Sequence, residues 1–201
     1  MSDSLQYTSS IKDMPLMFSE MRRTAILLGE GKADEEIIAL SMSGNIYQLE
    51  REKRRRDVPL RMLNRLSTLS EPLINIIADG SESDAKLIAF LALIKADRLF
   101  YEYMREVYAG IFQVGKGEID DKDFIDFIER KAQESNVVAG WTGNNRVRIR
   151  NTYKNVLCEA GLAKRNGPTS LLIQKPFLDA DLLALFDGEN VPYAKAMLLE
   201  V

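Results

Sequence analysis

The stretch NNRVRIRNTYKNVLCEAGLAKRNGPTSLLIQKP, residues 144–176, decides the fold class of the C-terminal part of this chain. A helix is predicted from Asn144 to Ala160, because apolar residues recur there at helical spacing and Gly161 is a typical residue after a helix end. The turn-rich KRNGPTS follows, and the short apolar LLIQK before Pro176 favours a β-strand. Two helices joined by a turn, then a basic turn leading to a strand, is the order of a winged helix-turn-helix.

The two sides of this predicted helix differ in chemistry. At 100° per residue, one side carries Ile149, Tyr153, Val156, Leu157 and Ala160, which we expect to be buried. The other side is rich in Arg and Asn, whose side chains pair with guanine and adenine edges in the DNA major groove. The nucleic-acid site predicted from this segment consists of Arg146, Arg148, Arg150, Asn151, Lys154, Asn155, Lys164 and Arg165. A solvated helix face followed by an ordinary hairpin is the alternative.

Within this set, Arg148, Asn151 and Asn155 are the candidates for reading bases. Arg146 and Arg150 lie nearer the edge of the helix and are candidates for phosphate contacts, while Lys164 and Arg165 stand at the start of the wing. Residues 141–175 carry seven basic side chains and one acidic side chain, in a protein whose formal net charge is -3. The sorted charge favours localised contacts with a polyanion.

A second basic block lies in residues 45–66, with seven basic and three acidic side chains. The charged side chains surround a predicted helix instead of lining one face. This arrangement suits contacts with backbone phosphates, which do not distinguish one base sequence from another. The candidates are Lys53, Arg54, Arg55, Arg56 and Arg61. An equally weighted alternative is that they pair with the acidic body at residues 67–140. Because proline lacks the N–H of an interior turn but suits a first turn, we expect Asp57 to cap a new helix that runs through Leu60, Leu63 and Leu66.

The chain is predicted to be mainly α-helical with a short β wing. Gly115-Lys116-Gly117 interrupts the helical pattern and is the expected boundary between two domains. Residues 1–115 would form a helical, bundle-like N-terminal domain, and residues 116–201 a winged-helix-like C-terminal domain.

Composition excludes several kinds of site. The chain has no histidine and one cysteine, so it offers no Ser-His-Asp or Cys-His pair and no histidine-ligated zinc. Asp120, Asp121, Asp123 and Asp126 are expected at the start of a helix for its dipole, and we do not interpret them as a metal site. The longest apolar run, Leu87 to Ile94, has eight residues, far short of a membrane span. We therefore expect a cytoplasmic protein that is not an enzyme and uses no metal or cofactor.

Four stretches resemble the BrxA family of bacterial BREX phage-defence systems. They are TSS near the N-terminus, FSEMRRTAILLGEG from Phe18, RRR before RMLNRLSTL, and IKADRLFYEYMREVY ending at Tyr108. The resemblance implies an all-helical cytoplasmic protein, compared in fold with the NusB antitermination factor, with DNA binding and a place in a multi-protein defence system. It supplies no residue-level motif, so the site residues rest on the helix-face argument alone.

Together these observations predict a non-catalytic protein that binds double-stranded DNA within BREX defence, alongside other BREX proteins and away from membranes. Two alternatives remain open. One is RNA binding in the manner of NusB, and the other is a protein-interaction subunit whose basic blocks dock on acidic partner surfaces.

Overall fold

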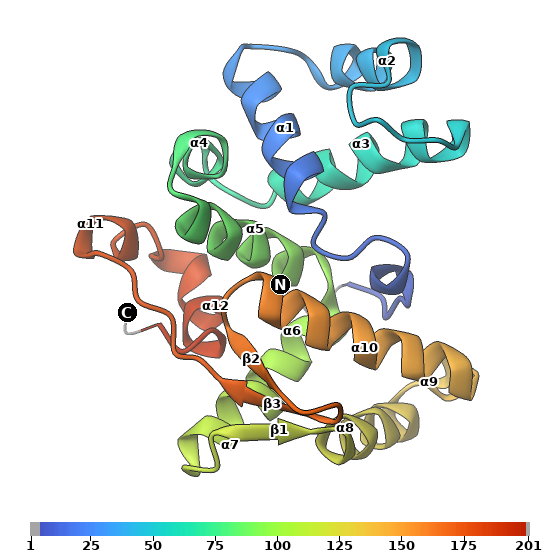
Figure 1. The fold of residues 1–201 in the computed structure, drawn as a ribbon, viewed down its shortest axis with the longest axis vertical. Helices are drawn as coiled ribbons and strands as arrows, with labels where there is room; N and C mark the ends of the chain where they lie inside the picture. Colours follow the sequence, from blue (N-terminus) through green and yellow to red (C-terminus); the bar gives the residue numbers. More distant parts are fainter. Residues whose placement is uncertain (1–4, 200–201) are drawn as a thin grey trace. The chain divides into compact units, whose positions relative to one another are not determined.

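The computed structural model describes residues 5–199, which fall into two compact units (Figure 1). The helical unit is Leu16–Ala96, and the mixed unit joins the described residues up to Pro15 with those from Asp97 onward. The predicted fold class is confirmed, since the chain is mainly α with one small antiparallel sheet. Within the described residues, no helix has both the length and the apolar character needed to cross a bilayer.

The helical unit is built from five helices that bury apolar stripes against one another. The helices are α1 (Phe18–Gly29), α2 (Asp34–Gly44), α3 (Glu52–Leu66), α4 (Glu71–Asp79) and α5 (Glu82–Ala96). Helix α1 packs against α3 and α4, while α2 packs against α3. Helix α5 contains the longest apolar run of the sequence, residues 87–94, and all eight residues of this run are buried.

Helix α3 corrects the prediction that a new helix starts after Asp57. The helix is continuous from Glu52 to Leu66, with Pro59 inside it, and Asp57 is not its cap. A proline at this position leaves the carbonyl of Arg55, four residues earlier, without its helical N–H donor. The buried hydroxyl of Ser41 donates to that carbonyl at 2.6 Å. A neighbouring helix therefore satisfies the acceptor that proline frees.

The mixed unit combines two longer helices, α8 and α10, and several short ones with a three-stranded sheet. Its elements before the sheet hairpin are η2 (Ser10–Lys12), α6 (Arg98–Tyr103), the π-helical turn η3 (Met104–Tyr108), α7 (Ala109–Gln113), β1 (Glu118–Asp120), α8 (Asp121–Glu134), α9 (Asn136–Ala139) and α10 (Gly143–Glu159). The hairpin strands β2 (Ala163–Asn166) and β3 (Ser170–Ile173) follow, then α11 (Ala180–Leu183), η4 (Gly188–Asn190) and α12 (Val191–Ala196). The order α8, α10, hairpin is the one predicted from the sequence.

The sheet has the strand order β1-β3-β2, and both pairings are antiparallel. Leu172 in the central strand pairs with Glu118 of β1 and with Lys164 of β2. Helix α10, orange in Figure 1, contacts both β2 and α8. The sheet and α8 therefore hold α10 in place between them.

Aromatic rings join α6 to α10, and hydrogen bonds join η3 to the residues that flank the hairpin. The rings of Phe100 and Tyr153 stack with centroids 4.0 Å apart, and the ring centroid of Tyr103 lies 5.0 Å from that of Tyr153. The hydroxyl of Tyr108 donates to the carbonyls of Leu162 and Gln174, at 2.7 and 2.9 Å. These contacts place residues 97–115 in the mixed unit.

The boundary expected at residue 115 therefore differs from the division in the structure, which falls at Ala96 and Asp97. Gly115 and Gly117 have φ values of 77° and 65° and form the turn between α7 and β1. Glycine is needed there for the left-handed backbone, so it marks a turn inside a unit instead of a linker between units.

Candidate nucleic-acid interface

The predicted sides of α10 are confirmed by burial. Ile149, Val156 and Leu157 are fully buried, and Tyr153 is 1% exposed. Arg148, Asn151 and Asn155 are exposed and form what we call the outer face of α10. The helix begins at Gly143 because the Thr142 hydroxyl accepts a hydrogen bond from the backbone N–H of Asn145 at 3.2 Å. The apolar periodicity alone thus determined which side faces solvent.

An acidic residue from the N-terminal segment meets the outer face at Arg148. The Arg148 guanidinium lies 2.9 Å from an Asp13 carboxylate oxygen, and the two side chains are 50% and 53% exposed. Lys12 lies 2.9 Å from the other oxygen of the same carboxylate. Hydrogen bonds from Lys12 and then Arg148 lower the pKa of Asp13 despite some burial. Arg148 is therefore exposed but already paired with an anion.

Asp121 at the start of α8 holds two of the other predicted cations. It lies 3.0 Å from Arg150 and 2.7 Å from Lys154. The Lys154 side chain is only 9% exposed, and its ammonium also donates to the carbonyl of Pro168 at 3.1 Å. Lys154 thus ties α10 to α8 and to the hairpin turn, and its ammonium is not presented on the outer face.

The neighbouring aspartates have local partners as well. The Asp120 carboxylate caps α8 by accepting from the backbone N–H of Lys122 and of Asp123, at 2.9 and 3.1 Å. Asp123 accepts from the Asp120 N–H and forms an ion pair with Lys116 at 3.0 Å. Capping and ion pairing therefore account for these acids at the start of the helix.

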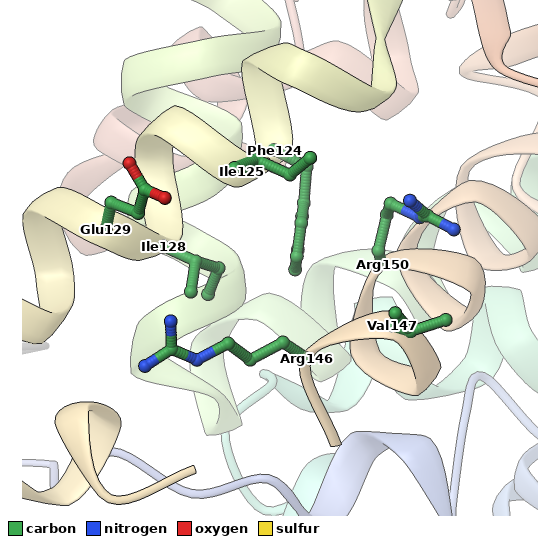
Figure 2. Close-up of a pocket in the computed structure, with 7 residues that line it drawn as sticks. All are labelled: Phe124, Ile125, Ile128, Glu129, Arg146, Val147 and Arg150. Atoms are coloured by element: carbon green, nitrogen blue, oxygen red, sulfur yellow. The ribbon is translucent and has the colours of Figure 1, made fainter. Parts of the chain in front are cut away.

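Arg146 points away from the outer face. Its guanidinium donates to the carbonyls of Val138 and Ala139, at 3.5 and 3.3 Å. Figure 2 shows Arg146 and Arg150 on α10 across a pocket from Phe124 and Ile128 on α8. The buried Nε of Arg146 has no hydrogen-bond partner in the described structure. Arg146 therefore binds the C-terminal end of α9 through its guanidinium group.

The hairpin brings Lys164 and Arg165 to the surface beside α10. Both side chains are exposed on β2, and the Arg165 guanidinium donates to the side-chain oxygen of Asn155. The hairpin turn contains Gly167, with φ of 76°, and has no acidic side chain between Lys164 and Ser170. The structure thus brings together the predicted wing and the outer face of α10.

The second predicted block belongs to the helical unit, on α3. Lys53 and Arg56 are exposed, and Arg56 lies 3.3 Å from Asp57. Arg55 is half-buried and donates to the carbonyl of Leu49 at 2.9 Å. Arg54 and Arg61 are also half-buried, and the guanidinium of Arg54 lies 4.0 Å from the sulfur of Met17. The block therefore divides into exposed cations and half-buried arginines, one of which supports the loop before α3.

Sequence reasoning missed the acids that pair with the predicted cations. Asp13 lies 135 residues before Arg148, and Asp121 lies 33 residues before Lys154. The helical repeat predicts where each basic residue lies on its helix. The neighbouring sequence does not predict which distant acidic residue it pairs with. Asp121 was visible only as an acid in the first turn of a helix.

Known proteins are similar in sequence to this chain over nearly its full length. The BrxA family profile matches residues 5–189. A curated "BREX protein BrxA" from Bacillus cereus (strain H3081.97) is 36% identical over 186 residues, which cover 90% of this chain and 92% of that protein. Another from Escherichia coli O9:H4 (strain HS) is 23% identical and covers 88% of this chain and 87% of that protein.

A solved structure shares the fold. The crystal structure of an uncharacterized protein from Magnetospirillum magneticum matches with a TM-score of 0.80, covering 97% of this chain and 99% of that chain. Its sequence identity is 21%, so the similarity concerns the fold alone.

Proposed function

The chain belongs to the BrxA family, and we propose that it is a non-catalytic, double-stranded DNA-binding component of BREX phage defence. In this proposal it acts in the bacterial cytoplasm alongside other BREX proteins and needs no metal or cofactor. The observation that carries the proposal is the exposed, carboxamide- and guanidinium-bearing outer face of α10 beside a basic hairpin.

The architecture around α10 supports this role. The order β1, α8, α9, α10, β2, β3, with β3 in the centre of the sheet, resembles that of a winged helix with the short α9 between its two main helices, and on this basis we assign to α10 the role of recognition helix. A major groove of B-form DNA accepts one α-helix, and Arg and Asn are suited to bidentate pairing with guanine and adenine. The hairpin would then lie along the adjacent backbone.

Duplex DNA fits the outer face better than duplex RNA does. The major groove of A-form RNA is deep and narrow, so side chains on a helix do not reach its base edges. Asn151 and Asn155 stand on a regular 17-residue helix, which needs a wide groove to bring their side chains to base edges. We therefore favour duplex DNA over duplex RNA.

The ion pairs reduce the expected number of phosphate contacts. Arg146, Arg150 and Lys154 are engaged with neighbouring helices, which leaves Arg148, Lys164 and Arg165 as the surface cations of the proposed interface in the mixed unit. Lys53 and Arg56 are the exposed cations that the helical unit would add.

The test is equilibrium binding of one labelled sequence in three forms: duplex DNA, single-stranded DNA and duplex RNA, at the same low salt concentration. The proposal predicts that duplex DNA binds at least tenfold more tightly than the other two. Preferential binding of RNA would favour the RNA alternative. Absence of binding to all three would favour the protein-interaction subunit.

A further inference from the structure

Two cationic groups converge on one carboxylate at the edge of the outer face. Lys12 Nζ lies 2.9 Å from Asp13 Oδ2, and Arg148 Nη2 lies 2.9 Å from Asp13 Oδ1. Lys12 is further oriented by the backbone carbonyl and the hydroxyl of Ser9, both at 3.2 Å. An anion with two oxygens thus already sits between a lysine and an arginine from distant parts of the sequence.

The N-terminal segment that supplies Lys12 and Asp13 is anchored to the mixed unit. Ile11 belongs to η2, which packs against α10, and its side chain is 1% exposed. The hydroxyl of Tyr7 donates to both carboxylate oxygens of Glu102, at 2.9 and 3.1 Å, and the guanidinium of Arg98 lies 4.4 Å from the centre of the Tyr7 ring. The position of Lys12 beside α10 is therefore fixed by buried and paired side chains.

We propose that Lys12 and Arg148 form a phosphodiester-binding site at the edge of the outer face, and that the Asp13 carboxylate occupies this site in the free protein. This inference rests on the proposed function and specifies how its site is regulated. Arginine and lysine make charge-assisted hydrogen bonds to carboxylate and to phosphate oxygens alike, so a backbone phosphate can replace the carboxylate.

Replacing the Asp13 carboxylate by a phosphate should cost little folding stability, because the ion pair between Arg148 and Asp13 is exposed. Both the Arg148 and the Asp13 side chain are about half exposed, and ion pairs of that kind contribute little to folding stability. The acid therefore lowers DNA affinity by competition while the fold depends on it only slightly. A phosphate that displaces Asp13 would bind Arg148 and Lys12 together.

The experiment compares Asp13→Asn with the wild-type protein in duplex DNA binding. We expect the variant to bind about two- to fivefold more tightly, the range that corresponds to a surface ion pair, with an unchanged melting temperature. The slope of the plot of log K against log salt should stay the same, because one phosphate occupies the site in both complexes and the variant loses only the competing carboxylate. Asp126→Asn is the matched control, since it removes the same charge from an exposed position of α8.

A second variant separates local competition from the change in net charge. In an Arg148→Gln background, the increase in affinity from Asp13→Asn should fall to that of Asp126→Asn. The inference is overturned if the two asparagine variants bind alike in the wild-type background, or if the increase persists without Arg148. If neither wild type nor variants bind duplex DNA, the proposed function itself fails, which is a distinguishable result.

Discussion

Replacing the outer face of α10 should abolish tight DNA binding while preserving the fold. The variant changes Arg148, Asn151 and Asn155 to alanine. All three side chains are exposed, and they take part in the ion pair to Asp13 and in hydrogen bonds from Arg150 and Arg165. None of them contributes to the buried side of the helix.

The expected change in folding stability is small because the contributions offset one another. Loss of an exposed ion pair costs roughly 0.2–1 kcal/mol. Each change of asparagine to alanine in a helix interior should raise the free energy of unfolding by about 0.6 kcal/mol, because alanine has the higher helix propensity. The net change in the free energy of unfolding should therefore lie within about 1 kcal/mol, as measured by urea denaturation.

The expected loss of binding is larger. A good base contact is worth about 1–3 kcal/mol, and even one such loss weakens binding about tenfold. We expect the dissociation constant for duplex DNA to rise at least tenfold at fixed salt, measured by fluorescence anisotropy. The matched control changes Arg130 and Gln133, exposed on α8, to alanine and should bind like wild type. A folded triple variant with wild-type affinity would refute the assignment of α10 and favour the interaction-subunit hypothesis.

Three further predictions concern stability. Tyr153→Ala should lower the free energy of unfolding by about 3–5 kcal/mol because it removes a buried ring. Tyr153→Phe should leave the free energy of unfolding almost unchanged, because the buried hydroxyl has no hydrogen-bond partner in the described structure. Urea titrations of both variants test this. Ser41→Ala should cost about 1–3 kcal/mol by leaving the Arg55 carbonyl unsatisfied, and an unchanged urea midpoint would contradict that role. Although burial raises it, hydrogen bonds led by Lys131 lower the pKa of Glu102 on balance, so its stabilising contribution is present above the usual glutamate pKa and is lost as pH falls through the lowered value. Glu102→Gln should therefore reduce the loss of thermal stability between pH 5 and pH 3, in about the range of glutamate titration, and an unaltered pH profile would contradict this.

The parts of the fold that sequence predicted well depend on local periodicity. The buried and exposed sides of α10 follow from the helical repeat, which projects Ile149 and Val156 to one side and Asn151 and Asn155 to the other. The hairpin follows from turn residues around Gly167. These features need no knowledge of distant residues.

The parts that sequence did not predict depend on contacts between distant segments. The continuity of α3 through Pro59 requires the hydroxyl of Ser41, which belongs to another helix. The burial of Lys154 depends on the position of Asp121 in α8, since an angle on a helical wheel does not locate the neighbouring helix. The grouping of residues 5–15 with the mixed unit likewise depends on the tertiary contacts of Tyr7 and Ile11.

The salt dependence of duplex DNA binding tests the central claim most directly, because the proposed interface has a defined set of exposed cations. Arg148, Lys164 and Arg165 alone would give a slope of log K against log salt of about -2.7, and Lys53 with Arg56 would extend it to about -4.5. We predict a linear plot with a slope in that range. A flat plot, or no binding to duplex DNA at low salt, would contradict the account.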